Sequence, residues 1–362
     1  MRIRIDRWQA LLCFGAAGAL VLSGCGGASK STDDQPESFS ASRIEILVGQ
    51  SPGGGHDTTA RAIADNLGNH LPNNPTIIVR NMPGADDKVM TNYLYNDAKA
   101  DGSFLGVMNF SIPTYQLQGE GPDQGVRYDS GKFNYLGSPT VTTYVLVLHK
   151  RLGIGADNLD ELATKKVRMA NETPGDGPHA AQAALELGLG WDLEPIFGYE
   201  GDSRTLAIER GEVDGVITTW ESLEQREAAG IESGDLIAVL TMGVDGPALE
   251  DPRLKDAKRA DELFASRSEE DRQILAVVQS KFGYARALAA PPNMSPEMVE
   301  QFRTAFMEMN EDPAYIERAE ASYFVVPTPG DVVQERIEKF MDTPREAVDA
   351  LAAKIAEESP NR

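Results

Sequence analysis

The chain has 362 residues, of which 41% are hydrophobic and 25% are charged. This length can bury a sizeable core and suits two domains better than one. The 34 Lys and Arg stand against 56 Asp and Glu, which gives a net charge of -22. Because phosphate binding depends on clustered Lys and Arg, this balance argues against nucleic-acid binding and against attraction to anionic lipid. The acidity fits either a saline exterior or ordinary solubility.

The amino terminus has the pattern of a targeting segment. Three arginines at positions 2, 4 and 7 precede an apolar run over 10–22, which is too short to span a bilayer as a mature helix. Leu22-Ser23-Gly24-Cys25 follows and resembles the bacterial lipobox, in which cleavage leaves the cysteine as the first residue, carrying acyl chains. The alternative is an ordinary secretory peptide that leaves Cys25 as a free thiol. The other cysteine, Cys13, would depart with the signal, so lipidation of Cys25 explains the one unpaired thiol.

Two short segments therefore precede the folded body. We expect a lipoprotein signal peptide over 1–24 and a flexible tether, rich in Ser, Gly, Asp and Thr, over 25–42. No later run approaches the roughly 18 apolar residues of a membrane span. The expected location is extracytoplasmic, with a lipid anchor on Cys25.

In the first half of the body, short β-like runs alternate with helical patterns. Predicted strands cover 43–48, 76–79, 104–108, 133–137 and 144–148. A helix after the first strand is predicted by apolar residues spaced along one face: Ala60, Ile63, Ala64, Leu67 and Leu71. Alternation of this kind is typical of α/β folds with parallel sheets. The strand at 144–148 is expected to carry the chain into a second lobe.

The second half repeats the pattern. Predicted strands cover 166–170, 196–199, 213–218 and 324–326, with Pro195 placed just outside a strand. Predicted helices follow Pro178 and Asp202 and cover 295–310 and 329–357, the last with a break near Pro344. We expect a first lobe over 43–145, a second lobe over 146–287, and a return to the first lobe with C-terminal helices over 288–362. The segment 245–270 has no assigned role.

Two glycine turns carry the candidate binding chemistry. Gly53-Gly54-Gly55-His56-Asp57 lies between a strand and a helix, where glycines let backbone N–H groups approach a ligand and the helix start attracts an anion. Gly175-Asp176-Gly177-Pro178 repeats the arrangement in the other half, with Pro at the start of the helix. Either turn alone could be a plain tight turn. Two such turns, one from each lobe, could grip one anion between them.

Metalloenzyme signatures are missing from the sequence. There is no His-Glu-x-x-His and no set of Cys ligands for a metal. The Gly-x-Ser-x-Gly spacing of a nucleophile elbow does occur once, at Gly49-Gln50-Ser51-Pro52-Gly53, where it overlaps the first glycine turn. His56 and His179 each lie beside a glycine turn, and a satisfied loop histidine is the more common role there. We therefore expect no catalysis, no cofactor and no metal site.

At these residues the sequence resembles the substrate-binding proteins of tripartite tricarboxylate transporters, the Bug receptor family. The resemblance covers roughly 42–356 and rests on several short motifs in order: Pro52–Asp57 with Ala60-Arg61, Asn81–Ala85, Lys99–Gly102, Gly177–His179, Tyr199–Gly201, Gly211–Asp214, Ala289–Pro292 and Asp312-Pro313.

The resemblance implies a two-lobed periplasmic-binding-protein (flytrap) fold of the α/β class, with parallel-type sheets flanked by helices. It implies a monomeric receptor that closes on a small di- or tricarboxylate or aromatic acid and delivers it to the transporter's membrane subunits. Backbone N–H groups and hydroxyls, rather than arginines, would hold the carboxylate. Carried over by position, the ligand-binding residues are Ser51, Gly54, Gly55, His56, Asp57, Ser111, Thr173, Gly177, Pro178, His179, Tyr199, Gly201 and Asp214.

One departure bears on the ligand. The family usually carries Gly-Gly after the Gly84-Ala85 turn, and this chain has Asp86-Asp87. Those carboxylates would occupy or repel the donors at the following helix start, which puts a second ligand carboxylate in doubt there. Two other functions stay open: a sensory receptor for a signalling partner, and an extracytoplasmic hydrolase using His56 or His179.

Overall fold

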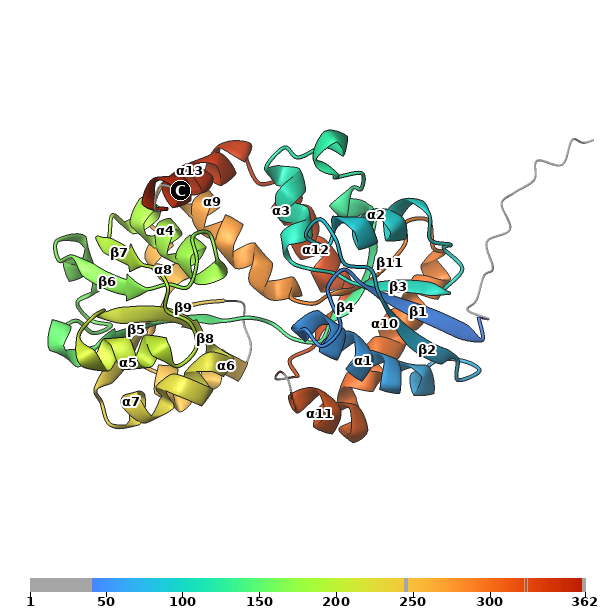
Figure 1. Cartoon of the computed structure of the whole chain (residues 1–362), viewed down its shortest axis with the longest axis horizontal. Helices are drawn as coiled ribbons and strands as arrows, with labels where there is room; N and C mark the ends of the chain where they lie inside the picture. The colour runs from blue at the N-terminus through green and yellow to red at the C-terminus, as the bar shows by residue number, and fades with distance from the viewer. Residues whose placement is uncertain (1–40, 244–246, 322, 324, 360–362) are drawn as a thin grey trace, which may run out of the picture. The chain divides into compact units, whose positions relative to one another are not determined.

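A computed structural model describes residues 41–359 except 244–246, 322 and 324 (Figure 1). The predicted signal peptide, Cys25 and nearly all of the tether lie outside the described residues. Within the described part, no helix is long and apolar enough to cross a membrane.

The first lobe is built on a six-stranded mixed sheet in the order β12-β4-β11-β3-β1-β2. Its strands are β1 (Arg43–Val48), β2 (Thr76–Asn81), β3 (Phe104–Val107), β4 (Asn134–Ser138), β11 (Leu288–Ala290) and β12 (Thr328–Pro329). Strand β1 pairs in parallel with β2 and β3, whereas β11 runs antiparallel to β3 and β4. The helices of this lobe are α1 (Gly55–Asn66), α2 (Lys88–Asn96), α3 (Ser111–Leu117), α10 (Pro296–Glu311), α11 (Pro313–Glu320) and α12 (Gly330–Met341).

Both faces of this sheet are buried. Alternate residues of a strand point to opposite faces, so Ile44, Ile46 and Val48 of β1 join one hydrophobic cluster with α1 and α10. Leu47 points the other way, into a cluster that contains residues of α2 and α12. Burial on both sides explains why the second half of β1, Ile46-Leu47-Val48, is a continuous apolar run.

The second lobe has a second six-stranded sheet, in the order β10-β9-β5-β8-β6-β7. Its strands are β5 (Tyr144–His149), β6 (Val167–Ala170), β7 (Leu193–Ile196), β8 (Gly215–Thr219), β9 (Leu236–Met242) and β10 (Lys258–Arg259). Its helices are α4 (Gly177–Leu189), α5 (Ser203–Arg210), α6 (Trp220–Ser222), α7 (Ala228–Glu232), α8 (Ala260–Phe264) and α9 (Glu269–Gln279). The last helix, α13 (Arg345–Glu358), packs on α4 and α9.

The sheets are mixed, where the sequence predicted parallel-type sheets. The strands that run against their neighbours include β5 and β11, the first strands after the chain passes from one sheet to the other. When the chain arrives from the other lobe, its next strand starts at one end of the sheet. When the chain arrives from a crossover helix of the same lobe, its next strand starts at the opposite end. This connectivity accounts for the antiparallel pairs.

Two local predictions were wrong. Pro195 lies inside β7 rather than outside a strand, which is possible because β7 is at the edge of its sheet, where a missing N–H costs no ladder bond. The strand predicted over 324–326 is absent at Val325 and Val326, and β12 forms instead at Thr328–Pro329; Phe324 lies outside the described residues. The break near Pro344 is confirmed, because it separates α12 from α13.

Candidate functional site

The Gly53–Asp57 turn is held by the carboxylate of Asp57. This side chain is buried and accepts hydrogen bonds from Gly53 N at 2.8 Å, from Asn81 Nδ2 at 2.9 Å and from Arg61 Nε at 2.8 Å. The Arg61 hydrogen bond, with those from Gly53 and Asn81, lowers the pKa of Asp57 to about 2 despite its burial. Asp57 therefore shapes the turn from within, and its carboxylate is already occupied.

His56 and Arg286 lie beside this turn. The Nε2 atom of His56 is buried and has no hydrogen-bond partner within the described part of the chain. Burial, and then the positive charge of Arg286, lower the pKa of His56 to about 4, so the ring is neutral at pH 7. A Cβ atom built on Gly55 would come within 3.1 Å of Arg286 Nη2, which places the guanidinium directly against the glycine turn.

The Gly175–His179 turn has the same kind of internal cap. Asp176 is the N-cap of α4, and its carboxylate accepts from His179 N at 2.8 Å and from Thr173 N at 3.0 Å. The His179 ring is fully buried, where Nδ1 accepts from Gly175 N at 2.9 Å and Nε2 lies 3.0 Å from Glu358 Oε2. Both ring nitrogens of His179 are thus engaged inside the protein, which is the structural role expected of a loop histidine.

One cavity is lined by residues from both lobes, and we call it the Ser111–Gly177 cavity. Its volume is about 350 Å³, within the range typical of small-molecule sites. The lining residues are Phe110, Ser111, Thr142, Tyr144, Gly175, Asp176, Gly177, Ala180, Val278 and Phe282. The first two come from the end of β3 and the start of α3, and the others from the second lobe and its connections. The aromatic and aliphatic side chains suit an apolar ligand body, and the polar groups could fix its orientation.

The two glycine turns do not line the same cavity. The Gly175–Gly177 turn lines the Ser111–Gly177 cavity together with Ser111. Residues Gly53 and Asp57 instead border a separate cavity of about 400 Å³ with Arg318 and Tyr323. The first lobe therefore contributes the loop after β3 to the Ser111–Gly177 cavity, and the loop after β1 stands beside Arg286.

The Asp86-Asp87 departure has a structural consequence. Ala85, Asp86 and Asp87 all have positive φ, at 47°, 51° and 68°, a conformation that favours glycine. The buried Asp87 carboxylate makes no side-chain cap at the start of α2 and accepts instead from Asn109 Nδ2 at 2.6 Å and Gln50 Nε2 at 3.4 Å. The prediction that this carboxylate would occupy the helix-start donors is thus corrected: it occupies side-chain donors from the loops after β1 and β3.

Several other predicted site residues lie apart from the cavity. The Tyr199 hydroxyl donates to Glu212 Oε2 at 3.1 Å, and Gly201 follows in the turn before α5 with φ 51°. Asp214 stands at the start of β8 and accepts from Arg168 Nε at 2.9 Å. Arg168 lies near the start of β6, whereas the Gly175 turn comes after the end of this strand. Because Asp214 pairs with Arg168, it lies at the opposite end of the sheet from the Gly175 turn. Ser51 and Thr173 are exposed turn residues, and Pro178 is in the first turn of α4.

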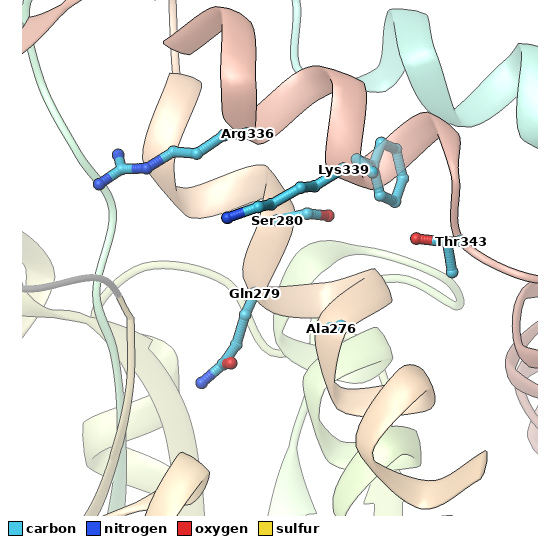
Figure 2. A pocket seen from close by; sticks show the side chains of 7 residues that line it. Ala276, Gln279, Ser280, Arg336, Lys339 and Thr343 are labelled. Atoms are coloured by element: carbon cyan, nitrogen blue, oxygen red, sulfur yellow. The ribbon is translucent and has the colours of Figure 1, made fainter. Parts of the chain in front are cut away.

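A further cavity of about 230 Å³ lies where the lobes are joined (Figure 2). It is lined by residues of α9, of the 3₁₀ turn after it and of α12, and by Thr343 two positions after α12: Ala276, Gln279, Ser280, Arg336, Lys339, Phe340 and Thr343. Both basic side chains have partners: Arg336 Nη1 donates to Gly283 O at 2.9 Å, and Lys339 Nζ pairs with Glu335 at 2.7 Å. The Arg336 hydrogen bond ties α12 to the connection between the lobes, whereas the Lys339 pair lies within α12 itself.

Sequence reasoning missed Phe110, Tyr144 and Phe282 in the cavity wall, and Arg286 beside the first glycine turn. The aromatic residues gave no signal, because strands and helices of any core contain such side chains. Arg286 did leave a signal in the sequence. It is the single charged residue in the stretch from Phe282 to Pro292, and a charge inside an otherwise uncharged segment that passes between the lobes is unusual.

Taken together, two mixed sheets, the crossings between them and a cavity lined from both sides define the fold of a periplasmic solute-binding protein. Among solved structures, the chain is similar to a TctC solute-binding protein from Polaromonas, with a TM-score of 0.68 and 18% identity over 85% of this chain and 98% of that one. It is also similar to the periplasmic binding protein BugD, with a TM-score of 0.50 and 17% identity over 86% and 97%. A protein of R. palustris solved with adipate gives a TM-score of 0.51 and 15% identity over 86% and 97%. No protein-family model matches the sequence, and no curated protein matches it.

The predicted two-lobed binding-protein fold is therefore confirmed. At these identities the similarity establishes the fold. The TctC and Bug proteins that share this fold belong to the group that the sequence motifs indicated.

Proposed function

We propose that the chain is an extracytoplasmic receptor that captures a small carboxylate in the Ser111–Gly177 cavity and presents it to the membrane subunits of a tripartite transporter. The observation that carries this proposal is the cavity itself, because its wall combines Ser111 from one lobe with the capped Gly175–Gly177 turn from the other. A ligand seated there touches both lobes at once. Its contacts would favour the closed arrangement, which is how such receptors couple binding to a change of shape.

The ligand class is supported by chemistry and by similarity. The guanidinium of Arg286, beside the first lobe's glycine turn, favours an anion on that side of the molecule. The similar protein of R. palustris was solved with adipate, a dicarboxylic acid. In this proposal the tether holds the body at the membrane surface through acylated Cys25, and the chain performs no catalysis.

The test is direct binding. Native mass spectrometry of the purified protein would reveal a carried ligand, and isothermal titration calorimetry against a panel of aliphatic and aromatic carboxylates, sugars and short peptides would identify its class. We expect saturable 1:1 binding by at least one carboxylate and none by sugars. Binding confined to sugars or peptides would refute the proposal.

A further inference from the structure

A buried histidine connects the wall of the Ser111–Gly177 cavity to helix α13. The His179 ring is fully buried, and the Phe197 ring packs edge-on against it with ring centres 5.0 Å apart. Its Nδ1 atom accepts a hydrogen bond from Gly175 N at 2.9 Å, and its Nε2 atom lies 3.0 Å from Glu358 Oε2. Because Gly175 lines the cavity, one ring joins a residue of the cavity wall to a residue of α13.

These two contacts select one tautomer of the ring. A backbone N–H can only donate, so the Nδ1 atom of His179 must present its lone pair to Gly175. In a neutral imidazole the proton then resides on Nε2, which donates to the carboxylate of Glu358. The partner of one ring nitrogen determines the role of the other. Glu358 therefore keeps Nδ1 available as the acceptor for the Gly175 amide.

Glu358 is itself held in place from its other side. Its Oε1 atom lies 2.7 Å from Lys354 Nζ, and Lys354 also lies 2.8 Å from Glu186 Oε2 of α4. The ion pair with Lys354 favours the carboxylate form of Glu358, which can only accept hydrogen bonds. Its side chain is 9% exposed, so little water competes for the His179 contact.

Helix α13 also touches elements that carry both walls of the cavity. A Cβ atom built on Gly175, which has φ 82°, would lie 3.5 Å from Ile355 Cγ2, so α13 packs directly on the turn. At the start of α13, Arg345 Nη2 donates to Gln118 O at 3.3 Å. Gln118 follows α3, the helix of the first lobe that begins with Ser111. The helix that supports the Gly175 turn is thus also in contact with the first lobe.

We propose that Glu358 is a positioning residue for ligand binding, which acts through His179 to fix the conformation of the Gly175–Gly177 turn. Without the carboxylate, the ring is free to take the other tautomer, and the Gly175 amide then loses its acceptor inside the protein. Ligand contacts made through the turn would weaken, because the turn would have to be ordered on binding. The inference rests on the proposed function and adds to its site a residue 179 positions after His179.

The contact can be tested without a ligand. Long-range proton–nitrogen NMR of the histidine rings reports which ring nitrogen carries the proton, and amide hydrogen exchange reports the protection of Gly175. We expect His179 in the Nε2–H tautomer and a protected Gly175 amide. Glu358→Ala should speed exchange of this amide about tenfold, the effect of losing one hydrogen bond. Glu358→Gln should restore most of the protection, because its amide oxygen can accept from Nε2.

Val348→Ala is the matched control. Val348 is buried on α13 about three helical turns before Glu358, so its truncation loosens the packing of the helix and leaves the carboxylate in place. It should leave the tautomer and the Gly175 exchange rate as they are in the parent protein. The proposal would be overturned by an Nδ1–H tautomer in the parent or by unchanged exchange in Glu358→Ala. Exchange as fast in Glu358→Gln or Val348→Ala as in Glu358→Ala would also overturn it, because loosened docking of α13 would then explain the effect.

Calorimetry with adipate, succinate and benzoate connects the turn to binding. Glu358→Ala should weaken binding of those that the parent protein binds several-fold, and Glu358→Gln and Val348→Ala should bind like the parent. Undiminished affinity in Glu358→Ala would overturn the inference and leave the carboxylate receptor standing. A parent protein that binds no carboxylate of the wider panel would refute the proposed function, and the exchange measurement would still decide whether Glu358 holds the turn.

Discussion

At Gly177 the backbone of the second lobe lies directly against the Tyr144 side chain of the cavity wall. A Cβ atom at this position would lie 1.9 Å from the hydroxyl oxygen of Tyr144. The Tyr144 ring cannot easily give way, because it is buried and packs edge-on against Phe282 with ring centres 4.7 Å apart. Glycine is required here by close approach, since the φ of Gly177 is not in the left-handed range.

Gly177→Ala should therefore damage both stability and binding. Forcing Tyr144 aside is an overpacking change, which typically costs about 1–3 kcal/mol of unfolding free energy. It should also weaken binding of any ligand that contacts Tyr144, and urea unfolding with calorimetry would measure the two effects. The control is Gly155→Ala, because a Cβ there meets only Asn158 Oδ1 at 4.0 Å. Equal behaviour of the two variants would contradict the steric argument.

At this scale the sequence predicted where α4 begins but not which contacts hold the turn before it. The Gly-Asp-Gly-Pro pattern predicted a helix start with bare donors, and α4 does begin there. The pattern could not reveal that Asp176 caps the helix with its own carboxylate or that Tyr144, 33 positions earlier, closes on the second glycine. Side-chain contacts between distant positions have no local signal in the sequence.

Helix α13 is attached to the second lobe through a buried charged cluster. Lys354 Nζ lies 2.8 Å from Glu186 Oε2 and 2.7 Å from Glu358 Oε1, and Glu358 also contacts His179. Burial and the neighbouring Glu358 raise the pKa of Glu186 to about 7. Burial opposes ionisation of Glu358 as well, but hydrogen bonds from His179, Glu186 and Lys354 lower its pKa to about 2. Glu186 thus keeps its proton to a higher pH than an ordinary glutamate does.

This cluster predicts a pH dependence of stability with a definite sign. Between pH 4.5 and 7 the folded state retains a proton on Glu186 that the unfolded chain has released, so this group lowers the unfolding free energy as the pH rises. Below pH 4.5 the lowered pKa of Glu358 acts the other way, and its contribution is lost as the pH falls toward 2.

Glu186→Gln should flatten the decline between pH 4.5 and 7, measured as the urea midpoint at several pH values. Glutamine keeps a donor toward Glu358 and cannot ionise. Glu346→Gln is the control, because Glu346 is exposed on α13 itself and should leave the pH profile as it is. A Glu186→Gln profile parallel to that of the parent would contradict the assignment.

At the scale of elements, the sequence predicted the local units better than their pairing. Strand β1 was placed over its full length, because its apolar residues, Ile44 and Ile46–Val48, precede a glycine turn. The reversed directions of β5 and β11 were not predicted, since direction depends on which end of the sheet the chain enters. Strand β12, with two residues, is too short to leave a periodic pattern, and the Val-rich run before it was mistaken for the strand.

For the whole molecule, the order of short motifs was enough to predict the two-lobed fold, but composition alone could not reveal the charge arrangement at the site. The net charge of -22 is a sum over the whole chain and does not locate a single charge such as that of Arg286. Arg286 meets the Gly55 turn across more than 200 positions of sequence. Such a contact is a product of the completed fold, so it could not be predicted from local motifs.

The same net charge predicts that salt stabilises the folded chain. With 56 acidic against 34 basic residues, compaction brings like charges together, and their repulsion opposes folding. Raising KCl from about 0.05 M to 0.5 M shortens the screening length from roughly 14 Å to 4 Å, so the urea midpoint should rise, with most of the gain at the lower concentrations.

NaCl should act equally, because screening does not depend on which monovalent cation is present. Near pH 4.6, where the net charge approaches zero, the same addition should have little effect. A midpoint that falls with salt at pH 7.5 would mean that attractive ion pairs, such as those of Asp57 and Asp214, outweigh the general repulsion.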